Sequence, residues 1–214
     1  MTELQSKYRN ALLSFQKQEA LTILKKGVDE LGQSNAIDAL ITQVLKDVGE
    51  EWVKGELAIS QVYMSARISE ELCEELFGHA EEDQGESTLA ISTLSDYHQL
   101  GKRIMCSVLR ASGYKIRDLG SGISPDALVE LIIEGGIKHL LISTLMLPTA
   151  LQVLDLRNAL KARNYHLEIM VGGAPFNFDK KLHQRVGADA VGHSAKDAME
   201  WINARSGRSY FRAE

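Results

Sequence analysis

The apolar residues of this chain change their spacing near residue 80. Before that point they recur every three or four residues, as in amphipathic helices, and no proline interrupts them. After it they form short runs separated by segments of helix length. Short, continuous apolar runs of this kind are typical of buried parallel strands, so the chain has to fold as a helical part followed by an α/β part. The runs are STLAISTL (87–94), YKIRDLG (114–120), IKHLLIS (137–143), LEIMVG (167–172) and ADAVG (188–192).

The helical part begins with a long apolar pattern that predicts two helices. Their boundary is expected near 14–17, and Gly32 ends the second of them because glycine readily adopts the conformation that terminates a helix. Ser34 or Asn35 can then cap a third helix, whose apolar positions continue to Val48.

A break at KGEL (54–57) separates this third helix from a fourth, which is expected to end at Gly78. We therefore predict an all-α four-helix bundle at 1–80. The stretch that follows is polar, acidic and glycine-bearing, which is the composition of an exposed linker, and we place that linker at 81–87.

The remaining segment, 88–214, alternates strands and helices in the order βαβαβαβαβα. This order predicts an α/β, flavodoxin-like (Rossmann-like) domain with a five-stranded parallel sheet. Ligands of such sheets bind beyond the carboxyl ends of the strands, where the strand order reverses. We therefore expect the functional residues in the loops that follow the strands.

Charge and composition argue against several classes of protein. The net charge of −5 lacks the basic footprint of a nucleic-acid binder. No apolar run approaches the length of about 20 residues that a membrane-spanning helix needs, so no membrane partner is expected. Cys73 and Cys106 lie far apart without CxxC spacing, which indicates buried, reduced thiols and favours a cytoplasmic protein.

Three of the expected strand-end loops carry residues suited to binding: a D-x-H-x-x-G motif, two hydroxyl residues and a glycine pair. An isolated D-x-H is explained better by a loop imidazole that caps the next helix, and a lone hydroxyl or glycine pair is more often a cap or a turn. Their convergence on one edge of the sheet favours a ligand site. These residues are Asp96, His98 and Gly101 after the first strand, Ser143 and Thr149 after the third, and Gly172 and Gly173 after the fourth.

The combination of D-x-H-x-x-G, S-x-L and GG, in a flavodoxin-like domain behind a helical bundle, resembles the cobalamin-binding module of methionine synthase and of corrinoid proteins. The resemblance covers nearly the whole chain. It implies that cobalamin is the cofactor and that His98 replaces the cofactor's own dimethylbenzimidazole as the lower cobalt ligand. Asp96 then corresponds to the carboxylate that holds the other imidazole nitrogen. Thr149, where methionine synthase has a serine, corresponds to the third member of this relay, which makes these three the candidate catalytic residues and His98 the metal ligand.

The residue types agree with this assignment on chemical grounds. A metal-bound imidazole is deprotonated at one nitrogen and is oriented by an acceptor at the other, and Asp96 is placed to be that acceptor. Gly101 is expected because a side chain there would occupy the space that the cofactor tail needs, although a glycine at the start of a helix is an alternative explanation.

The resemblance also implies a slot in the α/β domain that receives the displaced nucleotide tail of the cofactor. Ser143 and Leu145 are expected to line it. The chain departs from the common D-V-H-D-I-G-K-N form at Tyr97, Gln99, Leu100 and Arg103, and it has Leu147 where methionine synthase has a threonine. The full set of expected cofactor-binding residues is Asp96, Tyr97, His98, Gln99, Leu100, Gly101, Ser143, Leu145, Thr149, Gly172, Gly173, Ala174 and His193.

In the bundle, the stretch 48–72 resembles the helical cap of the corrinoid subunits of methyltransferase systems, which often carries P-Q-V-x-M-x-A. The resemblance implies a methyl carrier that binds cobalamin base-off/His-on and cycles between Co(I) and methyl-Co(III). Such a protein is one subunit of a multi-component methyltransferase rather than a complete enzyme. The length of 214 residues leaves no room for a TIM-barrel methyl-donor domain, which takes about 250 residues. The expected partners are therefore a donor-specific methyltransferase, a second methyltransferase on the acceptor side and a reductive activase.

Three other functions remain open at this point. A cobalamin-dependent sensor would use the same pocket without methyl transfer, although cobalamin photoreceptor regulators usually have Q-E-H where this chain has Gln61, Val62 and Tyr63. The small subunit of a carbon-skeleton mutase shares D-x-H-x-x-G but normally lacks the helical cap. A flavodoxin-like protein that binds no corrinoid is the third alternative.

Overall fold

The computed structural model describes residues 2–77 and 87–206. Contacts along the chain divide it into two compact units, Met1–His79 and Ala80–Glu214, and each is described by itself. The linker predicted at 81–87 lies, apart from Ser87, outside the described residues. None of the helices in the described ranges combines the length and the apolar character that a membrane span requires.

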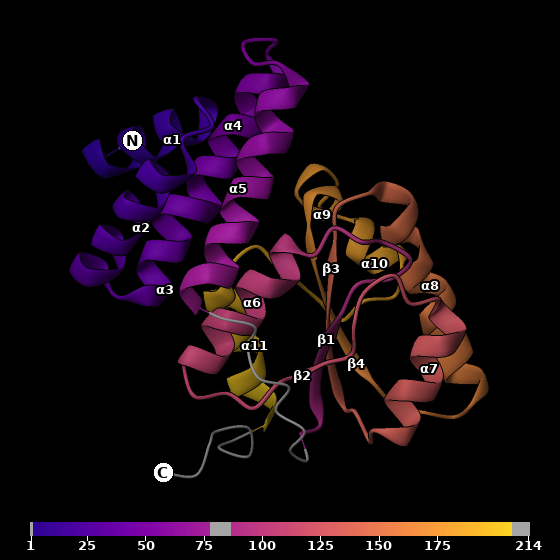
Figure 1. Ribbon diagram of the computed structural model, residues 1–214. Helices are drawn as coiled ribbons and strands as arrows, with labels where there is room; N and C mark the ends of the chain where they lie inside the picture. The colour runs from indigo at the N-terminus through magenta and orange to yellow at the C-terminus, as the bar shows by residue number, and fades with distance from the viewer. Residues whose placement is uncertain (1, 78–86, 207–214) are drawn as a thin grey trace. The chain divides into compact units, whose positions relative to one another are not determined.

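The first unit is all-α, as predicted (Figure 1). The predicted boundary near 14–17 is confirmed, because Phe15 has a φ of 58° in the turn between the first two helices. The third helix is continuous but changes to π-helical geometry in its middle. Its parts and its neighbours are α1 (Glu3–Leu13), α2 (Lys17–Leu31), α3 (Gln33–Ala36), η1 (Ile37–Thr42), α4 (Gln43–Val53) and α5 (Ile59–Phe77).

The predicted cap of the third helix is wrong. Gly32, with a φ of 78°, reverses the chain within one residue, so α3 begins at Gln33 and Ser34 lies inside the helix. Asn35 instead donates from Nδ2 to the carbonyl oxygen of Leu31, at 3.0 Å. It therefore satisfies an open carbonyl at the end of the preceding helix.

The core of the first unit is apolar and contains a buried polar contact between α1 and α5. Tyr8, Leu12 and Leu24 from the first two helices are fully buried. The hydroxyl groups of Tyr8 and Ser69 lie 3.3 Å apart in the same core, so α1 and α5 share a hydrogen bond where neither group can reach water.

The second unit is a parallel sheet in the order β2-β1-β3-β4-β5, which confirms the flavodoxin-like prediction. The strands extend the same way, as the register pairs Leu89 with His139 and His139 with Glu168. The edge strand β2 forms two residue pairs with β1, fewer than the apolar run at 114–120 predicts. The strands are β1 (Leu89–Ser92), β2 (Arg117–Asp118), β3 (His139–Thr144), β4 (Glu168–Gly173) and β5 (Ala190–Gly192).

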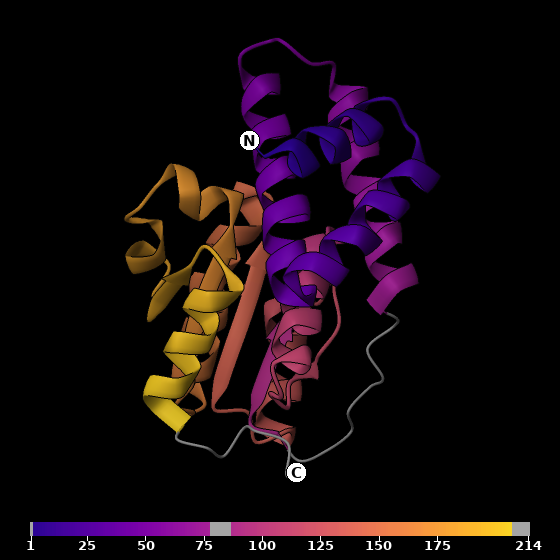
Figure 2. The same ribbon diagram turned by 90° about the vertical axis from the view of Figure 1, so that its left-hand side faces the viewer.

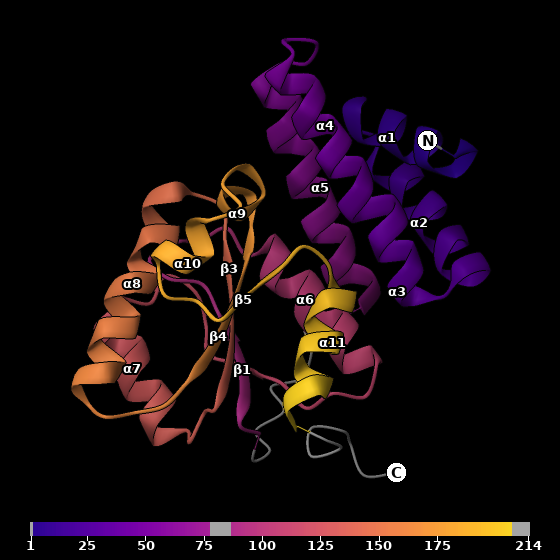
Figure 3. The same ribbon diagram turned by 180° about the vertical axis from the view of Figure 1, so that it is seen from behind.

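Helices cover both faces of this sheet. Helices α6 (Leu100–Ala111) and α11 (Ala195–Ser206) lie on one face, and α7 (Pro125–Glu134) and α8 (Leu147–Ala162) lie on the other (Figures 1 and 3). Figure 2 views the unit from the side of α6 and α11. Two short helices, α9 (Ala174–Phe178) and α10 (Leu182–Arg185), connect β4 to β5.

Alternate side chains of each strand supply the two cores. Leu89 and Ile91 pack in one cluster with Trp201 of α11, while Ala90 packs in the other with Val153 of α8. Successive residues of a strand point to opposite faces, so one short apolar run serves both layers. This packing fixes the strand ends from which the loops of the next section emerge.

Candidate functional site

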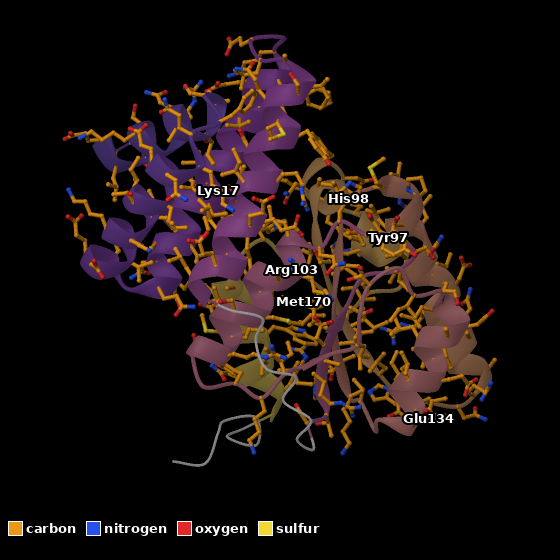
Figure 4. All side chains as sticks on the ribbon, viewed as in Figure 1. Lys17, Tyr97, His98, Arg103, Glu134 and Met170 are labelled. Atoms are coloured by element: carbon orange, nitrogen blue, oxygen red, sulfur yellow. The ribbon has the colours of Figure 1, made fainter. Side chains whose placement is uncertain are left out.

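The carboxyl ends of β1, β3 and β4 bring the three predicted loops to one edge of the second unit. Figure 4 shows Tyr97 and His98 at that edge and Glu134, at the end of α7, at the opposite one. In the sheet, β2 lies on one side of β1, and β3 lies on the other. The strand order therefore reverses at β1, and His98 is in the loop that follows this strand. This is the usual ligand position in an open α/β sheet.

The histidine and the aspartate of the motif form a tight pair. The backbone N–H of His98 donates to Oδ1 of Asp96 at 2.9 Å, and ring nitrogen Nδ1 of His98 lies 2.5 Å from the same oxygen. The side chain of Asp96 is 6% exposed, whereas that of His98 is 58% exposed. Because Nδ1 is engaged, Nε2 is the nitrogen left to bind a ligand, which is the arrangement that a metal-binding imidazole requires.

The carboxyl group of Asp96 is held in its ionised form. Burial raises its pKa, but hydrogen bonds from the backbone N–H and the imidazole of His98 outweigh that effect and keep the pKa below its ordinary value. The backbone N–H of Leu145 lowers this pKa further, so the loop after β3 faces the loop after β1. The second carboxylate oxygen, Oδ2, is buried and has no hydrogen-bond partner of good geometry within the described ranges.

The predicted third member of the relay is buried but separate. Thr149 lies in the first turn of α8 with 6% of its surface exposed. In the described part of the chain, the hydrogen bonds of the Asp96 carboxylate include none to Thr149. The relay remains a prediction.

Close packing within the protein explains the glycines of the site without a ligand. A Cβ at Gly101 would lie 2.8 Å from Oγ of Ser143, and one at Gly172 would lie 2.8 Å from the carbonyl oxygen of Gly192. Gly173 has a φ of 110°, and a Cβ there would overlap the backbone of Thr144 on the neighbouring strand. Close approach of α6 to β3 and of β4 to its neighbours therefore explains these glycines, and their contact with a cofactor tail remains a prediction.

The surroundings of His98 are apolar and open. Tyr97 is 78% exposed, and its ring lies over Gly122, where an added Cβ would approach it to 2.6 Å. Gln99 and Leu100 are half-buried beside it, as is Ala174 beyond β4. Exposed apolar side chains of this extent at a protein surface mark an interaction site. At the strand ends they are Tyr97, Leu145, Met146, Leu147 and Phe178.

His193 lies at the far side of this edge. Its Nδ1 is 2.7 Å from Oδ1 of Asn177, and its backbone N–H donates to Asp197, so it connects α9 to the start of α11. Two strands separate β5 from β1. At a spacing of about 4.8 Å per strand, the two loops are about 14 Å apart, so only a long ligand can contact both His98 and His193.

Sequence analysis missed one buried charge at the site, Lys102. Its side chain is 3% exposed, and Nζ lies 2.6 and 2.8 Å from the two carboxylate oxygens of Asp118. The available signal was a lysine in the first turn of a helix, directly after Gly101, where a cation is disfavoured by the helix dipole.

A cobalt corrinoid fits these residues. The cofactor carries its own metal in a macrocycle, so one imidazole whose Nε2 is not engaged would be enough to hold that metal from the protein. The buried, unpartnered oxygen of Asp96 and the exposed apolar rim fit a ligand that is large and partly apolar. Within the described residues, no group of three or more His, Cys, Asp or Glu side chains could hold a bare metal ion.

Comparison with known proteins identifies the same two parts of the chain. Two family models, each described as a B12 binding domain, match residues 86–202 and 4–76. Trimethylamine corrinoid protein 2 of Methanosarcina mazei is 28% identical over 94% of this chain and 95% of its own. Monomethylamine corrinoid protein 2 of Methanosarcina barkeri is 31% identical over 73% of this chain and 75% of its own. The solved structure of the Methanosarcina barkeri monomethylamine corrinoid protein has a TM-score of 0.77 at 26% identity, covering 94% of this chain and 97% of that one.

Proposed function

Because the chain belongs to the B12-binding family, as a corrinoid protein of methyltransferase systems with cobalamin as its cofactor, we propose that it is a methyl carrier. It shuttles a methyl group between partner methyltransferases. The relatives reported above are named for methylamines, and methylamines are accordingly the first donors to test. The carrier is one component of a multi-protein methyltransferase.

The observation that carries the proposal is the Asp96–His98 pair at the strand-order reversal. A buried, ionised carboxylate fixes one imidazole nitrogen, and the ring is otherwise exposed. We assign Nε2 of His98 as the nitrogen that would hold the cobalt in place of the cofactor's own base. When bound, cobalamin supplies the metal centre that accepts and releases the methyl group.

The chain's own residues orient the ligand and exclude water. Asp96 accepts the N–H at Nδ1, which selects the tautomer that leaves Nε2 unprotonated. The apolar side chains at the strand ends, among them Tyr97 and Leu145, cover the ring system and keep water from it. Ser143 and Thr149 line the route of the nucleotide tail.

We also assign residues that follow β4 and β5 to the binding of the cofactor's nucleotide tail. Gly172, Gly173 and Ala174 bring backbone rather than side chains to this part of the edge. The separation of about 14 Å between the loops of His98 and His193 suits a ligand with an extended tail. The bundle at 1–80 is assigned the role of a cap over the reactive face of the cofactor, joined by the linker at 81–87.

The partners follow from the proposed role. A carrier needs a methyltransferase that activates the donor, a second one that delivers the methyl group to its acceptor, and an activase that restores the reduced metal. We place the protein in the cytoplasm, since Cys106 is a buried thiol outside any disulfide.

His98→Ala tests the axial ligand. In the Co(II) state, wild-type protein loaded with cobalamin should give an EPR spectrum split by one histidine nitrogen, and His98→Ala should lose that splitting while retaining some cobalamin through its tail. His166→Ala is the matched control, because that imidazole is exposed and precedes β4 at the opposite edge. An unchanged splitting in His98→Ala would refute the assignment.

Methyl transfer is tested separately from ligation. The reduced, cobalamin-loaded protein is mixed with monomethylamine, dimethylamine or trimethylamine and a methyltransferase specific for that amine, and demethylation of the amine is followed. A sensor would bind cobalamin with the same EPR spectrum and catalyse no demethylation with any donor. That outcome would replace the carrier role with a regulatory one.

A further inference from the structure

Lys102 is placed where its charge is unfavourable on two counts. It is 3% exposed, so its ammonium group has lost nearly all contact with water. It also lies in the first turn of α6, near the positive end of the helix dipole. Asp118 offsets both effects through two short contacts to its carboxylate. A pair with such costs is poorly explained by stability alone.

Asp118 joins this charge to the loop that follows β2. Its Oδ1 accepts the backbone N–H of Gly120 at 2.8 Å, in addition to the bond from Lys102. Gly120 has a φ of 101° at the start of the loop. Bonds from Thr93 N–H and Ser92 Oγ to the carbonyl oxygen of Gly120 also hold the loop, so the carboxylate supports it together with these contacts.

The same loop holds the turn that carries His98. The backbone N–H of Gly122 donates to the carbonyl oxygen of Asp96 at 2.9 Å, and the N–H of Ser95 donates to the carbonyl oxygen of Ile123 at 2.9 Å. Ser95 has a φ of 38°, an unfavourable conformation for a residue with a side chain, so the turn needs such bonds to persist.

We propose that the Lys102–Asp118 ion pair is a positioning device for His98. The pair fixes the loop at 118–123, and the loop fixes the backbone of Ser95 and Asp96, from which the imidazole is oriented. The inference rests on the proposed function for its significance, because a ligand held in advance does not lose conformational entropy when it binds the metal. The mechanical claim, that the ion pair fixes the loop and the backbone of Ser95 and Asp96, concerns the protein without its cofactor.

The chain contains a second ion pair in which a shielded cation meets a partly exposed aspartate, and it serves as a matched control. Arg157 Nη2 lies 2.5 Å from Oδ2 of Asp189, and that oxygen accepts the backbone N–H of Ile169 at 2.7 Å. The side chain of Arg157 is 11% exposed. Ile169 lies in β4 and Asp189 precedes β5, and neither contacts the His98 turn through a hydrogen bond in the described part of the chain.

Amide hydrogen exchange in the cofactor-free protein measures the effect directly. In Lys102→Met, the amides of Ser95 and Gly122 should exchange about tenfold faster or more than in wild type, since the loop loses its anchor. In Arg157→Met, the amide of Ile169 should accelerate while those of Ser95 and Gly122 keep their wild-type rates. Equal acceleration of Ser95 and Gly122 in both variants would reduce the effect to general destabilisation and overturn the proposal.

A double variant separates positioning from stability. In Lys102→Met/Asp118→Leu no unpaired charge remains, so stability in urea should recover toward wild type. The contact between Asp118 and Gly120 is still absent, so the amides of Ser95 and Gly122 should remain fast. Recovery of stability and exchange rates together would show that the pair only stabilises the fold.

The cobalamin-loaded protein supplies the second readout. Lys102→Met should broaden or partly lose the histidine nitrogen splitting of the Co(II) EPR spectrum, and Arg157→Met should leave it unchanged. If wild type lacks the splitting, the proposed ligand is wrong, whereas the exchange data still decide the mechanical claim. If wild type has it and Lys102→Met has an identical spectrum, the positioning role is refuted while the proposed function stands.

Discussion

Gly173→Ala should cost the second unit a large part of its stability. Gly173 is the last residue of β4 and pairs with Thr144 at the end of β3. Its φ of 110° is strained for any residue with a side chain, which costs about 1–3 kcal/mol. The added Cβ would also overlap the carbonyl oxygen of Thr144, an atom fixed by the ladder, and overpacking of this kind costs about 1–3 kcal/mol. We therefore expect a loss of about 2–6 kcal/mol.

Gly136→Ala is the control for a positive φ without a steric clash. Gly136 has a φ of 61°, and no atom lies within 4 Å of the position of an added Cβ. Its replacement should cost about 1–2 kcal/mol, the penalty of a left-handed conformation alone. The excess in Gly173→Ala then contains the steric contribution of Thr144 together with the additional cost of a backbone at φ 110° and ψ −178°, a region essentially restricted to glycine.

The assay is urea unfolding of the cofactor-free protein, followed by tryptophan fluorescence. The chain has two tryptophans, Trp52 in the first unit and Trp201, which packs against the sheet of the second. A Trp52→Phe background therefore reports on the second unit. If Gly173→Ala is no more destabilised than Gly136→Ala, β4 can relax away from β3, and the explanation of this glycine by close strand contact is wrong.

Two further predictions concern ionisable groups in the second unit. Burial raises the pKa of the Cys106 thiol to about 12. In a Cys73→Ser background, iodoacetamide at pH 8 should therefore label Cys106 only after the protein is unfolded. Labelling of the folded protein at the rate of an exposed thiol would contradict the buried placement. Burial lowers the pKa of His139 below its ordinary 6.5, and Glu168 opposes this shift only in part. A proton therefore binds the unfolded chain more tightly than the folded one. The free energy of unfolding should fall as the pH drops through and below 6.5. His139→Phe keeps an aromatic ring beside Trp201 and should flatten this dependence in urea midpoints measured from pH 8 to pH 5, whereas parallel curves would assign the acid sensitivity to other groups.

The fold was predictable because the spacing of apolar residues along the chain differs between helices and buried strands. Apolar residues recur with a helical period up to residue 77, and they form short continuous runs after residue 87. The first pattern buries one stripe of each helix, and the second buries both faces of each strand, so the two patterns correspond to the two units. The location of the site was predictable for a related reason. Parallel strands place all their carboxyl ends on one edge, so Asp96, His98 and Gly172 had to lie there once the strand order was known.

Only the tertiary structure decided what those residues contact. Asp96 and His98 are two positions apart, so their pairing follows from a local turn, and the sequence pointed to it. Lys102 and Asp118 lie on different elements, and nothing in the spacing of the chain indicates that they meet. The same holds for Gly173, whose constraint is the backbone of Thr144, and for Asn35, which bonds back to Leu31 because Gly32 turns the chain. Periodicity and motifs encode interactions within one element, whereas contacts between elements depend on how the sheet and its helices pack.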